Sequence, residues 1–79
     1  MAQMSWRWHD EADGEVYVAR LLPNGLIAVD ARGSGSWGTW TPDGAVRAGD
    51  LTRSRNAWRI SRWVRDSFTG YVNGEGGGA

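Results

Sequence analysis

The sequence has no cysteine and no lysine, and it has a single histidine. Without cysteine, neither a disulfide nor a zinc site built on thiolates can stabilise the chain. The covalent nucleophiles cysteine and lysine are both missing, and no Ser-His-Asp order accompanies the one histidine. The chain also has no apolar run long enough for a signal peptide or a membrane span. We therefore expect a non-catalytic protein in the cytoplasm that needs no cofactor and no membrane.

Tryptophan, in contrast, is abundant. A chain of 79 residues buries only about 60 to 65% of the surface that its unfolded form exposes, so a few large side chains must supply the core. Each tryptophan can bury about 150 to 250 Å². The six are Trp6, Trp8, Trp37, Trp40, Trp58 and Trp63. We expect one small domain over residues 1–72, followed by a flexible glycine-rich tail over residues 73–79.

Turn sequences divide the first fifty residues into short segments. They are Asp13-Gly14, Pro23-Asn24-Gly25, Gly33-Ser34-Gly35 and Pro42-Asp43-Gly44. Between them lie strand-length runs, and the first two alternate in the manner of half-buried strands. Because the turns are short, consecutive strands should pair antiparallel as a meander of four or five strands. A strongly bent meander would be an SH3-like barrel.

The end of the sequence changes to a helical period. On a 3.6-residue repeat, four apolar residues share one stripe: Ala57, Ile60, Val64 and Phe68. This pattern predicts a helix over about residues 53–68, with Thr52 or Ser54 as N-cap and Gly70 just beyond its C-terminus. The predicted fold class is α+β: an antiparallel meander sheet followed by one C-terminal amphipathic helix packed on it.

The other side of this helix is the first candidate binding surface, which we call the Arg/Trp surface. Its members are Arg55, Trp58, Arg59, Arg62, Trp63 and Arg65. Arginines three or four positions apart repel each other by about 0.2 to 0.5 kcal/mol per pair, so a negative group should offset them. That group could be a phosphate, a carboxylate of another protein, or the chain's own acidic turn. The acidic turn comprises Asp10, Glu11, Asp13 and Glu15 and is the second candidate surface.

The charge distribution bears on these alternatives. Residues 1–50 carry four Arg against seven acids, a balance of −3, whereas residues 51–79 carry five Arg against two acids, a balance of +3. Arginine interleaved with tryptophan suits phosphates and unpaired bases. A net charge of zero and an acidic turn are unfavourable for a nucleic-acid partner. Tryptophan and arginine are also enriched at protein interfaces, and a protein partner of mixed charge fits both ends of the chain.

Two local patterns are weak candidates for chemistry. His9 stands beside Asp10 and near Asp13, but one histidine without cysteine favours a surface turn over a metal site. The GSGSWG run lacks the Gly-Lys-Ser/Thr ending of a phosphate-binding loop, so a hairpin turn explains it better.

One hairpin resembles a known repeat family. The segment GSWGTWTPDGAVRAG, residues 35–49, is similar to one hairpin of the choline- and glucan-binding cell-wall repeats. That resemblance implies an exported glycan binder that uses Trp37 and Trp40. The sequence departs from the family at Gly38 and Thr39, where paired aromatics are expected, and it has no second repeat. The simpler explanation of the similarity is that unrelated proteins use the same kind of hairpin.

The chain as a whole is similar to the anti-CRISPR proteins of phages and mobile elements. The resemblance lies in small size, the lack of catalytic motifs, the dipolar charge and the many tryptophans, and it includes no residue motif. It implies steric inhibition, in which the protein occupies a surface where a host CRISPR effector complex holds or admits DNA. Either the acidic turn would imitate phosphates, or the Arg/Trp surface would bind acidic groups of the effector. The alternative is a nucleic-acid-binding accessory protein that uses the same helix.

Overall fold

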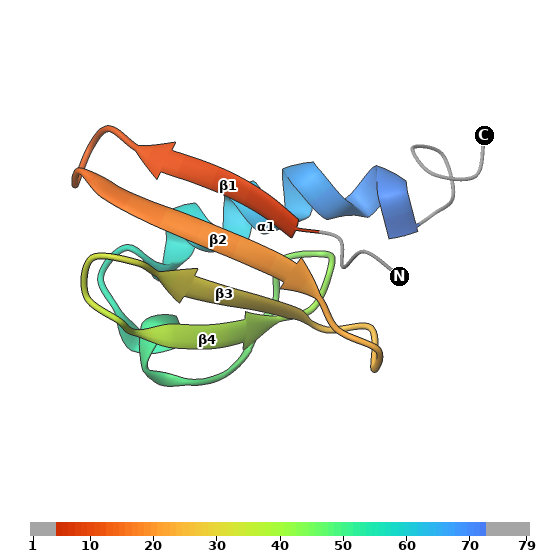
Figure 1. The fold of residues 1–79 in the computed structure, drawn as a ribbon. Helices are drawn as coiled ribbons and strands as arrows, with labels where there is room; N and C mark the ends of the chain where they lie inside the picture. The colour runs from red at the N-terminus through yellow and green to blue at the C-terminus, as the bar shows by residue number, and fades with distance from the viewer. Residues whose placement is uncertain (1–4, 73–79) are drawn as a thin grey trace.

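The computed structural model describes residues 5–72, with side chains through Phe68, and shows a meander sheet followed by one helix (Figure 1). The strands are β1 Ser5–Asp10, β2 Glu15–Leu21, β3 Ile27–Ala31, β4 Trp37–Trp40 and β5 Val46–Ala48. A 3-10 turn, η1 Asp50–Arg53, leads to helix α1 Ala57–Val72. The predicted α+β fold is confirmed, with five strands. Residues 73–79, the predicted tail, lie outside the described residues.

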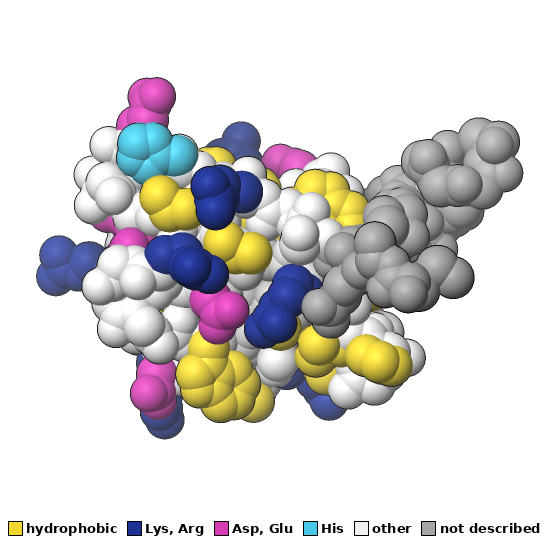
Figure 2. Space-filling view, viewed as in Figure 1, with side chains coloured by type: hydrophobic (Ala, Val, Ile, Leu, Met, Phe, Trp, Pro, Cys, Tyr) yellow, Lys and Arg dark blue, Asp and Glu magenta, His cyan; other side chains and the backbone are white. Residues whose placement is uncertain are grey.

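The sheet follows the order of the chain. Its strands run β1-β2-β3-β4-β5, each antiparallel to the next, so β1 and β5 form the two edges. The register places Arg7 opposite Val18, Val18 opposite Asp30, and Asp30 opposite Trp37. This row lies on the face away from α1, where Figure 2 shows hydrophobic, basic and acidic side chains interspersed.

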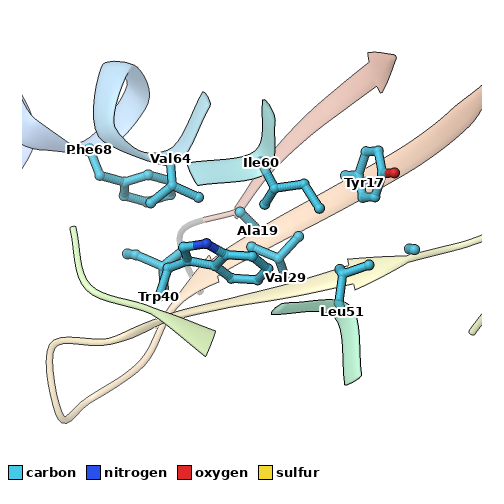
Figure 3. Close-up of a cluster of buried hydrophobic side chains, with 10 residues drawn as sticks. Tyr17, Ala19, Val29, Trp40, Leu51, Ile60, Val64 and Phe68 are labelled. Carbon is cyan, nitrogen blue, oxygen red and sulfur yellow. The ribbon is translucent and has the colours of Figure 1, made fainter. Parts of the chain in front are cut away.

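The core lies between the other face of the sheet and α1 (Figure 3). Alternate residues of the strands enter it because successive side chains of a strand point to opposite faces. The fully buried side chains include Tyr17, Ala19, Ile27, Val29, Trp40, Ile60, Val64 and Phe68. The predicted helical stripe is therefore confirmed, with Ala57 half-buried at its start.

A polar residue within the helical stripe has a partner in the core. Trp40 is fully buried, and its indole Nε1–H donates to Ser61 Oγ at 2.8 Å. A buried indole N–H normally needs such an acceptor. Ser61 therefore belongs on the buried side of α1 although it is not apolar.

The helix boundaries differ from the prediction. Leu51 in η1 is 4% exposed, so the 3-10 turn packs an apolar side chain into the core before the helix starts. Ser54 then has an extended backbone, and its Oγ accepts the Asn56 N–H at 2.9 Å. The Thr52 hydroxyl donates to the Gly49 carbonyl at 2.7 Å and does not cap α1.

The prediction that the helix ends before Gly70 is wrong, because α1 continues to Val72. Gly70 therefore lies inside the helix and does not follow its last residue. Over residues 5–72, no helix is long and apolar enough to cross a membrane.

Candidate binding site between β1 and α1

The acidic turn folds against the start of α1. Asp10, at the end of β1, is 4% exposed, and its Oδ2 accepts the Arg59 Nε–H at 2.9 Å. Asp13 Oδ2 accepts the Tyr17 hydroxyl at 2.8 Å and the Asn56 amide at 2.6 Å. It also lies 3.6 Å from Arg59 Nη2. Strand β1, strand β2 and α1 are thus joined by one polar network.

This network supplies a negative group that offsets part of the positive charge on the helix. Helix α1 has no acidic residue in its first turn, so Asp10 and Asp13 supply the negative charge that favours a helix N-terminus. Arg59 therefore does not point away from the domain, and its side chain is only 25% exposed. For this arginine, the offsetting group is the chain's own acidic turn.

The acidic turn is largely engaged as a result. Asp10 and Asp13 bind within the network, and Glu15 Oε1 accepts the Gly33 N–H at 2.7 Å. Among its four carboxylates, Glu11 alone has no hydrogen bond or ion pair to a described residue. A phosphate-imitating role would therefore have to rest mainly on one exposed carboxylate.

The network also changes two pKa values. Burial opposes ionisation of Asp13, but hydrogen bonds from Glu15 N–H and the Tyr17 hydroxyl and the charge of Arg59 together lower its pKa below 3.8. Burial and the hydrogen bond to Asp13 raise the pKa of Tyr17 to about 12. Both shifts favour an ionised Asp13 that accepts from a protonated Tyr17.

A shallow hollow of about 280 Å³ lies beside this network. It is lined by Trp8 from β1 and by Trp58, Arg59, Arg62, Trp63 and Asp66 from α1. Trp8 stacks on Tyr17 with ring centroids 5.2 Å apart and contacts Trp63 at 5.0 Å. We call this feature the tryptophan hollow. Its inner wall belongs to a series of ring contacts that runs from Tyr17 through Trp8 to Trp63.

Trp58 forms the exposed rim of the hollow and is 61% exposed. The Arg59 guanidinium lies 5.6 Å from the centre of its ring. The spacing of the sequence also allows contacts of Arg62 with Trp58 and of Arg59 with Trp63, but among these tryptophans and arginines the cation–π pair is Arg59 with Trp58. The acidic turn thus positions Arg59, and Arg59 in turn contacts Trp58.

The arginines of the Arg/Trp surface differ in their pairing. Arg59 is bound to Asp10, and Arg65 Nε lies 3.6 Å from Asp66 Oδ1. Arg55 and Arg62 are exposed and form no ion pair with any described carboxylate. Two positive charges on this surface therefore have no carboxylate partner in the part of the chain that the structure describes.

The structure brings together four of the six residues predicted for the Arg/Trp surface. Trp58, Arg59, Arg62 and Trp63 line the hollow, whereas Arg55 and Arg65 do not. Sequence reasoning missed the contributions of Trp8 and Asp66. Asp66 could have been found because it lies four positions after Arg62, on the same side of the helix.

The glycan-binding alternative is wrong for Trp40. Trp37 and Trp40 are three positions apart, so a strand directs them to opposite faces. Trp37 is 51% exposed, whereas Trp40 is fully buried. The two rings therefore cannot form one sugar-binding surface.

The structure also shows where the three residues of the weak candidate metal site lie. His9 is exposed on β1, while Asp10 and Asp13 turn towards Arg59. Within the described part of the chain, no group of three or more His, Cys, Asp or Glu side chains could hold a metal ion.

Comparisons with protein-family models, with curated proteins and with solved structures found no match for this chain. They add no support to the resemblance to anti-CRISPR proteins. The features of this chain that bear on its function are therefore the tryptophan hollow and the charges around it.

Proposed function

We propose that this chain is a small non-catalytic binding domain that holds a protein partner at the tryptophan hollow and the adjoining part of the Arg/Trp surface. The observation that carries the proposal is the exposure of Trp58, which is 61% exposed beside two other tryptophans. Folding does not require a large aromatic side chain at that position. Tryptophan and arginine together are the residues most enriched at interface hot spots.

The pairing of the arginines favours protein over nucleic acid. The affinity of a nucleic-acid-binding surface grows with the number of phosphates that it neutralises. On the Arg/Trp surface, only Arg55 and Arg62 lack an ion pair with a carboxylate of the described residues, and Asp66 lies in the hollow itself. Two unpaired arginines are few for a surface that tracks a phosphate backbone, so nucleic-acid binding remains the alternative.

The partner that we put forward is a host CRISPR effector complex in the cytoplasm, with the chain acting as an inhibitor that covers its DNA-binding surface. This identity rests on the resemblance in size and character to anti-CRISPR proteins. Because three carboxylates of the acidic turn are engaged within the molecule, the tryptophan hollow is the better candidate for the contact. The assay is binding of target DNA by a purified effector, which the wild-type chain should reduce.

The binding site is tested with a Trp58→Ala/Arg62→Ala variant. Loss of a hot spot worth about 2 kcal/mol or more should weaken binding of a captured partner by at least about tenfold. Both side chains are exposed, so thermal unfolding should change little. The measurement is the affinity of the purified partner for each variant.

The matched control is Trp37→Ala, which removes an exposed tryptophan from the opposite face of the sheet. If both variants retain the partner equally well, the hollow is not its binding site. Tight binding of DNA or RNA that falls steeply with added salt would instead favour the nucleic-acid alternative.

A further inference from the structure

The size of the tryptophan hollow indicates what it can hold. Its volume is about 280 Å³, at the lower end of the roughly 300 to 1,000 Å³ of sites that enclose small-molecule ligands or cofactors. It is open to solvent, and three of its six lining residues are tryptophans. Such a hollow suits one large side chain of a peptide, with the peptide backbone remaining at the surface.

The walls favour an aromatic side chain. Trp8 and Trp63 lie 5.0 Å apart with their planes inclined by 32°, and Trp58 stands at the rim. Aromatic rings pair best in offset or edge-to-face arrangements with centroids about 4.5 to 7 Å apart. Trp8 is itself stacked on the buried Tyr17, which supports its ring from the side of the core.

The charges at the rim determine what should stand next to that ring. Three tryptophans alone would also suit a quaternary ammonium group. Arg59, Arg62 and Asp66 also line this hollow, however, and the charge of Arg62 repels a cation. Arg59 is already bound to Asp10, and Asp66 has Arg65 at 3.6 Å. Arg62 is therefore the one charged lining residue that forms no ion pair with another described residue. A carboxylate of the partner would complement it.

This inference rests on the proposed function. We propose that the hollow recognises an acidic peptide segment of the partner. An aromatic side chain of that segment enters among the tryptophans, and a neighbouring carboxylate pairs with Arg62. The aromatic ring provides most of the contact, and the carboxylate provides the selectivity. Cationic neighbours are excluded by the same arginine.

The test is an NMR titration of the full chain with short capped peptides that carry Phe-Glu, Phe-Gln, Phe-Lys or Ala-Glu between glycines. The indole N–H resonances of Trp58 and Trp63 should shift with the Phe-Glu peptide. Binding should weaken roughly twofold to fivefold for Phe-Gln, as expected for one exposed ion pair, and further for Phe-Lys. The Ala-Glu peptide should cause no comparable shift.

Arg62→Gln should abolish the difference between the Phe-Glu and Phe-Gln peptides, whereas Arg47→Gln, an exposed arginine on β5, should preserve it. The proposal is overturned if about 10 mM Phe-Glu peptide, well above a millimolar Kd, leaves the indole resonances unmoved. It is also overturned if Phe-Lys binds as well as Phe-Glu, or if a thymidine oligonucleotide binds at the hollow more tightly than Phe-Glu. If partner capture depends on Trp58 and Arg62 while the peptides do not discriminate, the proposed function stands and this inference fails.

Discussion

Arg59 connects three parts of the molecule. Its Nε donates to Asp10 at 2.9 Å, its Nη2 donates to Asn56 Oδ1 at 2.8 Å, and its guanidinium lies over Trp58. Asp10 is 4% exposed, and Arg59 is its ion-pair partner. A buried carboxylate that loses its counter-charge is strongly destabilising. Arg59 is thus as much a structural residue as a surface residue.

We therefore expect Arg59→Ala to lower the free energy of unfolding by about 3 kcal/mol, because it leaves Asp10 buried and unpaired. Arg62→Ala is the matched control on the same helix, and it should cost less than about 0.5 kcal/mol because Arg62 is exposed and forms no ion pair within residues 5–68. Urea denaturation measures both. Equal costs for the two variants would show that the ion pair contributes nothing to stability.

Tyr17 makes stability depend on pH at the alkaline end. Its pKa is raised from 10.0 to about 12 in the folded state, by burial and by its hydrogen bond to Asp13. A raised pKa means that the folded state holds the proton more tightly than the unfolded state. The stabilisation is therefore complete below pH 10 and is lost as the pH rises towards about 12.

This dependence should show as a falling denaturation midpoint between pH 10 and pH 12. Tyr17→Phe keeps the ring that stacks on Trp8 but removes the ionisable hydroxyl, so its midpoint should fall less over the same range. A parallel fall in both proteins would assign the effect to other groups.

At the scale of elements, the β4–β5 hairpin docks on α1 at one point. Gly44 in its turn has φ +96°, and a Cβ there would lie 2.7 Å from the Ser61 carbonyl oxygen. The Ser61 side chain also accepts the hydrogen bond of Trp40. The hairpin and the helix therefore meet at Ser61 through both backbone and side chain.

Gly44→Ala should consequently be costly. It combines a strained positive φ, worth about 1 kcal/mol, with a close contact that shifts the hairpin from the helix, for a total of about 2 to 3 kcal/mol. Gly25→Ala is the matched control, because Gly25 has φ +88° and open space around its Cβ position. Thermal unfolding compares the two, and equal losses would mean that the hairpin does not press on α1.

At the scale of the whole molecule, the fold brings the acidic and basic parts of the chain together. The balance of −3 over residues 1–50 and +3 over residues 51–79 suggests a strongly dipolar protein. In the structure, Asp10 and Asp13 lie against Arg59, so part of this asymmetry is neutralised inside the domain. Of the remaining positive charges on this surface, Arg55 and Arg62 are exposed, and Arg62 lines the hollow together with the exposed Trp58.

The sequence by itself determined the elements of this protein. Alternation defined the strands, glycine and proline marked the turns, and the 3.6-residue repeat placed Ile60 and Val64 in the core, because these patterns depend only on local backbone geometry. The predicted helix boundaries were less accurate, because a 3-10 turn that buries Leu51 in the core precedes the helix.

Only the tertiary structure decided how the candidate site is assembled. Asp10 and Arg59 are 49 positions apart, and no periodicity relates the turn between β1 and β2 to the side of a helix that follows four strands later. The same holds for Trp8, which meets Trp63 because α1 crosses the sheet beside β1. The angle and depth at which a helix docks depend on how all the core side chains pack together. That packing determines that Arg59 is neutralised and that Trp58 stays exposed.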